Sequence, residues 1–106
     1  MNAHNMPLSE RIGRAQRKWV DLDAAARLLE STKSAVFSQM VVALGDMPVS
    51  RAENAVRASA EWIDHVEKVE KARTAANHAR VELDYLKNQL VEWQSFAADE
   101  RLRAKI

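Results

Sequence analysis

The chain has 106 residues, no cysteine and a formal net charge of +1 at pH 7. This length fits one domain, the lack of cysteine excludes disulfides and thiolate metal sites, and the small net charge excludes a strongly basic nucleic-acid-binding protein. Hydrophobic residues make up 47% of the chain, with only two glycines and two prolines, a composition that favours an all-α fold.

Residues 1–8 are a short, polar start without an apolar run of signal-peptide length. Nowhere do 18 consecutive apolar residues occur, so no segment is expected to span a membrane. Together with the absent cysteines, this predicts a cytoplasmic protein and no membrane partner.

The first predicted helix covers residues 9–44. Ser9 is a candidate N-cap residue, and Gly45 follows the helix as a typical C-terminal stop. Apolar residues recur along this stretch at helical spacing, broken only by Lys33. The stripe consists of Ile12, Ala15, Trp19, Leu22, Ala26, Leu29, Lys33, Val36, Met40 and Ala43.

A turn is predicted over residues 45–50, because Pro48 would break a helix running through it. Ser50 and Glu53 then have the spacing of a capping box, in which the serine hydroxyl and the glutamate carboxylate each accept a backbone N–H of the other residue. A second helix is therefore expected to begin at residue 51.

This second predicted helix, residues 51–104, contains an unbroken heptad stripe. Seven-residue steps give Ala55, Trp62, Val69, Ala76, Leu83, Leu90, Ala97 and Ala104. The positions three residues further on are Ala58, His65, Ala72, Ala79, Leu86, Trp93 and Glu100. Apolar residues at these spacings with charged flanks predict one long, coiled-coil-like helix.

Two long helices with a short connection predict an antiparallel hairpin in a single domain, 1–106. Counting outward from a turn near residue 48, paired residues should have numbers that sum to roughly 96. Lys33 would then lie near Trp62 and Glu61, as a cation–π or ionic contact, unless its segment bends into solvent.

The start of the first helix lies opposite about residue 87, because the two helices are antiparallel. Residues 88–106 of the second helix therefore extend beyond the hairpin without a partner helix. Their apolar side chains are expected to need a cover, such as a second copy in a dimer or higher oligomer, or a partner protein. The alternative is a break near Asn88 and Gln89, after which the chain folds back as a three-helix bundle. The predicted partner or oligomer interface is Leu86, Leu90, Trp93, Phe96 and Leu102.

The sequence contains no nucleophilic cysteine, glycine-rich phosphate loop or metalloprotease motif. Glu61 with His65, and His78 with Glu82, each offer two potential metal ligands one helical turn apart, but no further ligands accompany them. We therefore expect no catalytic residue, metal or cofactor. A metal-dependent enzyme is the third class of function, and elemental analysis of the purified protein tests it.

Basic residues concentrate away from the turn. Residues 1–20 carry a net charge of +3 and residues 71–90 carry +2, whereas residues 21–70 carry −4. A cationic end of the rod can contact phosphates in a salt-dependent way, although such residues also serve as the solvated flanks of coiled coils. The predicted DNA-contacting residues are Arg11, Arg14, Arg17, Lys18, Arg73, Arg80 and Lys87.

Several short elements lie along the chain between about residues 30 and 103. They are Glu30-Ser31-Thr32-Lys33-Ser34, Ser50-Arg51-Ala52-Glu53, Ala58-Ser59 with Trp62, Ala72-Arg73 with Ala75-Ala76, Tyr85-Leu86-Lys87, and Trp93 with Ser95 and Arg101. In these elements the chain resembles small uncharacterised all-helical proteins of temperate phages and prophages, encoded among early recombination and replication genes. The resemblance implies a phage accessory protein that works near DNA, and it implies no catalytic residue.

The function predicted from these features is that of a non-enzymatic accessory protein. It would bind DNA, or a host or phage protein that handles DNA, through its basic end and its aromatic C-terminal helix segment. The alternative is an assembly or inhibitor module without DNA affinity, whose helical face occupies a groove on another protein.

Overall fold

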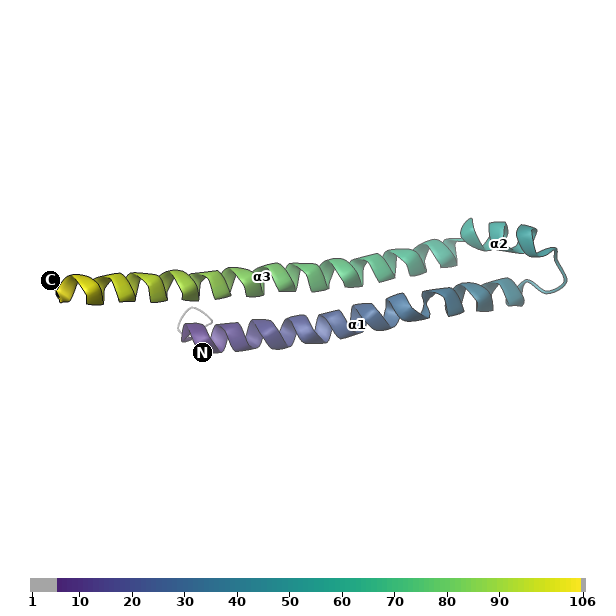
Figure 1. The fold of residues 1–106 in the computed structure, drawn as a ribbon. Coiled ribbons are helices and arrows are strands. Elements are labelled where there is room, and N and C mark those ends of the chain that lie inside the picture. The colour runs from purple at the N-terminus through teal and green to yellow at the C-terminus, as the bar shows by residue number, and fades with distance from the viewer. Residues whose placement is uncertain (1–5, 106) are drawn as a thin grey trace.

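The computed structural model describes residues 6–105, which form a rod measuring 83 × 29 × 16 Å. Its helices are α1 (Leu8–Ala43), α2 (Val49–Arg57) and α3 (Ala60–Ala104). α1 and α3 run antiparallel, and α2 lies at the turn end (Figure 1). The radius of gyration is 23.2 Å, whereas a compact domain of this length would have about 13 Å. The predicted all-α, extended hairpin is therefore confirmed.

The first helix ends where the glycine predicts. Gly45 has a φ of +75°, a left-handed conformation that glycine adopts without a steric penalty. Its N–H donates to the carbonyl of Val42, and the N–H of Leu44 donates to Val41. At the other end the N-cap residue is Pro7, without a side-chain bond, so Ser9 lies inside α1 instead of capping it.

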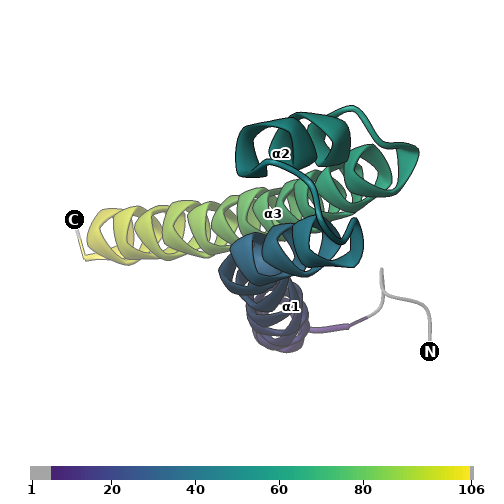
Figure 2. The same cartoon turned by 90° about the vertical axis from the view of Figure 1, so that its right-hand side faces the viewer.

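The second predicted helix, 51–104, is divided in two. α2 ends at Arg57 and α3 begins at Ala60, and the axis of α2 is displaced from that of α3 (Figure 2). Ser59 sits in the break: its Oγ accepts the Trp62 N–H at 3.2 Å and donates to the Val56 carbonyl at 2.6 Å. One side chain thus bonds a backbone group of each helix, which reduces the cost of ending one and starting the next.

The predicted capping box at Ser50 and Glu53 is wrong. The N-cap residue of α2 is Pro48, which makes no side-chain cap bond, and Ser50 already lies within the first turn of α2. This short helix is held by packing instead, since it buries Ala52 and Val56.

The seam between α1 and α3 consists largely of small residues. α1 buries Ala15 and Ala26, and α3 buries the heptad residues Val69, Ala76, Ala79, Leu83 and Leu86. Alanine at these positions lets two helix backbones approach closely with few voids. The predicted register also holds, because Asp23 of α1 pairs with Arg73 of α3.

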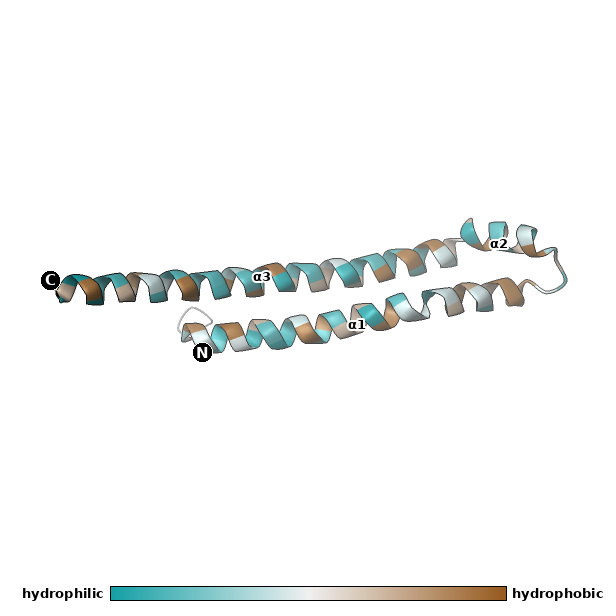
Figure 3. Cartoon of the chain, in the orientation of Figure 1, coloured by the Kyte–Doolittle hydropathy of each residue, from teal (hydrophilic) through white to brown (hydrophobic). Residues whose placement is uncertain are grey.

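α3 continues straight past the start of α1 (Figure 1), so the predicted alternative of a fold-back near residue 88 is wrong. Leu8, the first residue of α1, packs against the core cluster that contains Leu83 and Leu86. Residues 91–104, here called the projecting segment, therefore extend beyond α1 over about 21 Å. Hydrophobic residues recur along it up to the C-terminal end (Figure 3).

Candidate functional site

The projecting segment exposes large apolar side chains. Trp93 and Phe96 are each 64% exposed, Leu102 is 63% exposed and Val91 is 59% exposed. Isolated surface residues of this kind are ordinary, but a helix end with four of them within twelve residues is typical of an interaction surface. Val91 belongs to the overhanging apolar residues but was not among those predicted to form the interface.

Two residues of the predicted interface are not on the exposed surface of the projecting segment. Leu86 is only 3% exposed and belongs to the hairpin core with Ala15 and Leu83, so it is unavailable to a partner. Leu90 is half-buried at the base of the projecting segment. Among the predicted residues, Trp93, Phe96 and Leu102 remain as the accessible ones.

The exposed residues do not all share one face. Leu90, Trp93 and Ala97 are spaced by three and four residues and form one stripe, with Phe96 beside it. Val91 and Leu102 lie on another side of the helix. Val91 precedes Trp93 by two residues, which corresponds to a rotation of about 200° around the helix axis. The stripe through Leu90 and Ala97 is the continuation of the seam that packs on α1, so it offers the surface that a further helix would fit.

The predicted basic residues form two rows on opposite sides of the seam. Arg73, Arg80 and Lys87 follow one another at seven-residue spacing on α3, on the side where Arg73 meets Asp23. Lys18, by contrast, lies beside His78 and Glu82. Five residues separate Lys18 from Asp23, a rotation of about 140° around α1. The structure therefore does not bring all seven predicted basic residues onto one phosphate-binding face.

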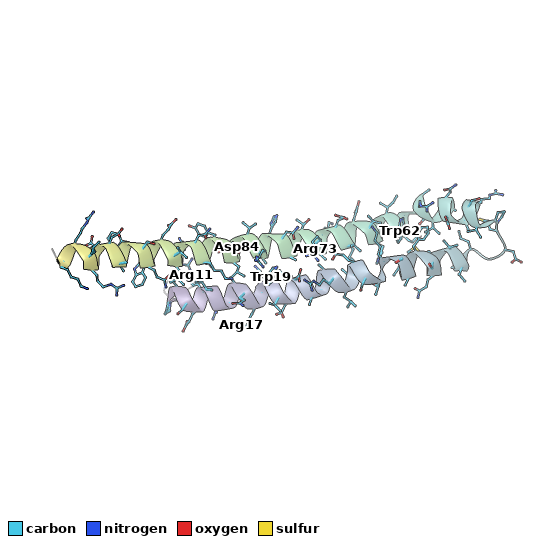
Figure 4. The ribbon with its side chains drawn as sticks, in the orientation of Figure 1. Arg11, Arg17, Trp19, Trp62, Arg73 and Asp84 are labelled. Carbon is cyan, nitrogen blue, oxygen red and sulfur yellow. The ribbon has the colours of Figure 1, made fainter. Side chains whose placement is uncertain are left out.

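Arg73 holds the two long helices together. Its Nη1 donates to Asp23 Oδ1 at 2.8 Å, and its Nε and Nη2 donate to the two oxygens of Glu30 at 2.9 and 2.7 Å. All three guanidinium nitrogens are thus used within the chain. The predicted phosphate contact of Arg73 conflicts with this geometry, and the residue is better described as a clamp between α1 and α3 (Figure 4).

The clamp changes the proton affinity of its members. Hydrogen bonds from Arg73 lower the pKa of Asp23 and of Glu30, and the opposing desolvation is smaller. Reciprocally, the hydrogen bonds to Glu30 and then to Asp23 raise the pKa of Arg73. The sequence offered one signal for this cluster, because the register places Asp23 opposite Arg73 and Glu30 lies seven residues further along the same side of α1.

Arg80 is also engaged within the chain. Its guanidinium carbon lies 4.7 Å from the ring centroid of Trp19, and its Nε donates to Asp84 at 3.2 Å. A planar guanidinium over an indole covers the ring and remains partly accessible.

Four of the predicted DNA-contacting residues are more accessible. Arg14, Arg17, Lys18 and Lys87 are exposed and make no ion pair within residues 6–105. Arg17 lies on the side of α1 away from α3, whereas Arg11 is half-buried toward α3 (Figure 4). The basic residues that can meet a phosphate are therefore mainly those of α1.

The described part of the chain contains no group of three or more potential metal ligands from His, Cys, Asp and Glu. Nor does it contain a helix that is long and apolar enough to cross a membrane. The Nε2 atom of His65 is buried without a hydrogen-bond partner in this part of the chain, next to Trp62, whose ring centroid is 5.8 Å away.

Comparisons of the chain with known protein families, with curated proteins and with solved structures find no match.

Proposed function

We propose that the protein is a non-enzymatic accessory protein that acts through protein–protein contacts of its projecting segment. The observation that carries this proposal is the continuation of the heptad seam beyond α1. Val69, Ala76 and Leu83 pack within the hairpin, and the same spacing continues to Leu90, Ala97 and Ala104, where α1 no longer covers it. In the first half of α3 this stripe packs on another helix, α1. The same spacing in the second half therefore suits the packing of a further helix there.

The partner that we propose first is a second copy of this chain. An antiparallel pairing of two projecting segments is twofold symmetric, so each copy offers and covers the same surface. Trp93 and Phe96 would supply the aromatic anchors on which interface affinity commonly depends. An overlap of about four helical turns is short, so we expect a weak dimer whose population depends on concentration.

Sedimentation velocity over a range of protein concentrations tests this proposal. The wild-type chain should shift from monomer toward dimer, whereas the double variant Trp93→Glu, Phe96→Glu should stay monomeric with unchanged helicity by circular dichroism. Val81→Glu is the matched control, because Val81 is an exposed apolar residue of α3 outside the projecting segment, 68% exposed. A wild-type chain that stays monomeric at every concentration would show that self-association is wrong.

DNA binding is the second candidate function, and the exposed cations without an ion pair support it. Arg14, Arg17 and Lys18 lie in the first turns of α1, whose start packs beside Leu83 and Leu86 of α3. Lys87 lies on α3, in the row on the other side of the seam. Combined with the resemblance to temperate-phage proteins, this arrangement suits an accessory protein that works beside recombination or replication proteins in the host cytosol.

Fluorescence anisotropy with labelled single- and double-stranded DNA tests this second function. If four phosphates are neutralised, affinity should fall about 100-fold between about 50 and 200 mM salt. The triple variant Arg14→Gln, Arg17→Gln, Lys18→Gln should lose binding, while Arg51→Gln, Lys68→Gln, Lys71→Gln, which removes three other exposed cations, should retain it. Equal binding by both triple variants would refute a specific role for the α1 cations.

A further inference from the structure

An open hollow of about 370 Å³ lies near the turn end of the rod, far from the projecting segment. It is lined by Glu30, Lys33, Ser34 and Phe37 of α1, Arg57 of α2 and Trp62 of α3. All three helices thus contribute to it. Its volume lies at the lower end of the range for small-molecule sites, about 300 to 1,000 Å³.

Two aromatic rings form an apolar surface in this hollow. The Phe37 and Trp62 ring centroids are 5.0 Å apart, with an interplanar angle of 63°. This edge-to-face contact holds both rings in place across the α1–α3 boundary. A flat apolar group would find a prearranged surface here.

Two cations accompany these rings. The Nζ of Lys33 lies 6.0 Å from the Trp62 ring centroid, and the guanidinium carbon of Arg57 lies 5.2 Å from that of Phe37. Lys33 is half-buried yet makes no ion pair with another residue of the range 6–105. A cation that is partly removed from water without a counter-charge gains strongly from an incoming anion.

The nearby carboxylates leave this positive charge largely uncompensated. Glu30, which lines the hollow, is held by Arg73 through two hydrogen bonds. Arg57 has Glu53 as its ion-pair partner at 3.5 Å and also donates to Asn54 Oδ1 at 3.5 Å. Both contacts are long and lie between exposed side chains, where an ion pair contributes little. Lys33 and Arg57 therefore remain available to a ligand.

The helix break at Ala58 and Ser59 is what assembles this site. On a straight helix, Arg57 and Trp62 are five residues apart and would point about 140° away from one another. The break lets α2 turn, so that Arg57 reaches Phe37 while Trp62 packs against the same ring. The departure from the predicted continuous helix thus brings together the residues that line the hollow.

We propose that this hollow binds a small organic anion with a flat apolar body, such as an aromatic carboxylate. The flat body lies against Phe37 and Trp62, and the anionic group lies within reach of Lys33 and Arg57. This site is independent of the proposed protein–protein function, because it lies near the opposite end of the rod.

Nuclear magnetic resonance of the ¹⁵N-labelled full chain tests the proposal with 2-naphthoate as probe. The indole N–H signal of Trp62, assigned with the variant Trp62→Phe, should move to saturation, while those of Trp19 and Trp93 stay in place. Two control compounds separate the contributions. Naphthalene-2-methanol keeps the flat body without the charge and acetate keeps the charge without the flat body, and neither should saturate the signal over the same concentrations.

Variants then test the two cations. Lys33→Gln and Arg57→Gln should each weaken 2-naphthoate binding about fivefold, the effect of one partly exposed charge contact. Lys68→Gln, which removes an exposed lysine of α3 outside the hollow, should leave binding unchanged. The proposal is overturned if naphthalene-2-methanol binds as tightly as 2-naphthoate, if neither cation variant weakens binding, or if only the Trp93 signal moves. These outcomes decide only whether the hollow binds the probe, and the sedimentation test of the projecting segment is read separately.

Discussion

Arg73 links α1 and α3 through its ion pairs with Asp23 and Glu30. Asp23, which it contacts, is only 13% exposed, and Arg73 itself is 29% exposed. Ion pairs at such partly buried positions are screened by solvent far less than surface pairs. Removing one partner leaves the other charges partly desolvated and without compensation.

Arg73→Ala should therefore lower the melting temperature measured by circular dichroism. Arg103→Ala is the control, because Arg103 pairs with Glu100 at 3.8 Å and is 79% exposed, so its loss should leave the melting temperature nearly unchanged. If both variants melt at the same temperature, the clamp does not stabilise the hairpin.

The same cluster predicts how stability depends on pH. Arg73 lowers the pKa of Asp23 and Glu30 in the folded chain below their ordinary values of 3.8 and 4.5. Carboxylates whose pKa is lower in the folded state stabilise it above the unfolded-state pKa, and this stability is lost as the pH falls through the folded-state pKa. The melting temperature should thus decrease progressively below about pH 4.5.

The double variant Asp23→Asn, Glu30→Gln isolates this contribution. It should melt at a lower temperature than wild type at pH 7, and its melting temperature should change less between pH 5 and pH 3. An identical pH profile for the two proteins would show that other carboxylates determine acid unfolding.

At the scale of the helices, the break between α2 and α3 depends on one hydroxyl group. Ser59→Ala removes both bonds of its Oγ and should lower the free energy of unfolding by about 1 kcal/mol in urea titrations. Ser50→Ala is the matched control, since Ser50 lies inside α2 without a cap bond and should have little effect. If Ser50→Ala lowered the free energy of unfolding more than Ser59→Ala, the predicted capping box would be the stronger signal for a helix start.

The hairpin could be predicted from sequence because its signals are local and repeated. The glycine after α1, the proline in the turn and the seven-residue stripe of α3 each point to the same topology, and the register follows from counting. The break at Ala58 and Ser59 could not be predicted in this way. The stripe runs through it with Ala55, Ala58 and Trp62, whereas the bend is favoured by the capping bonds of Ser59 and by the packing of α2 against the other helices.

The candidate sites were less predictable, because they depend on the angle at which each side chain leaves its helix. Arg73 and Lys87 look alike in the sequence, yet Arg73 is held by two carboxylates of α1 while Lys87 is exposed. Lys33 was expected near Trp62, and the structure confirms that proximity. The role of Arg57 had no signal in the sequence, since it results from the break.

At the scale of the whole molecule, the proposed dimer has a distinctive shape. Two rods 83 Å long that overlap only through their projecting segments would reach about 145 Å. Small-angle X-ray scattering should therefore show a maximum dimension near this value at high concentration and near that of one rod on dilution. A dimer no longer than a single rod would mean that the hairpins pack side by side, which contradicts pairing through the projecting segment.

The elongated hairpin also implies an order of assembly. At the turn end, Phe37 and Trp62 are 25 residues apart in the sequence, whereas at the open end Leu8 meets a cluster containing Leu86. Closing the longer loop costs about 1 kcal/mol more in chain entropy, so pairing should begin at the turn and proceed toward the termini. In native-state hydrogen exchange, amides of the paired part of the hairpin should be least protected near the start of α1, where transient opening would uncover Leu83 and Leu86 directly beside the projecting segment.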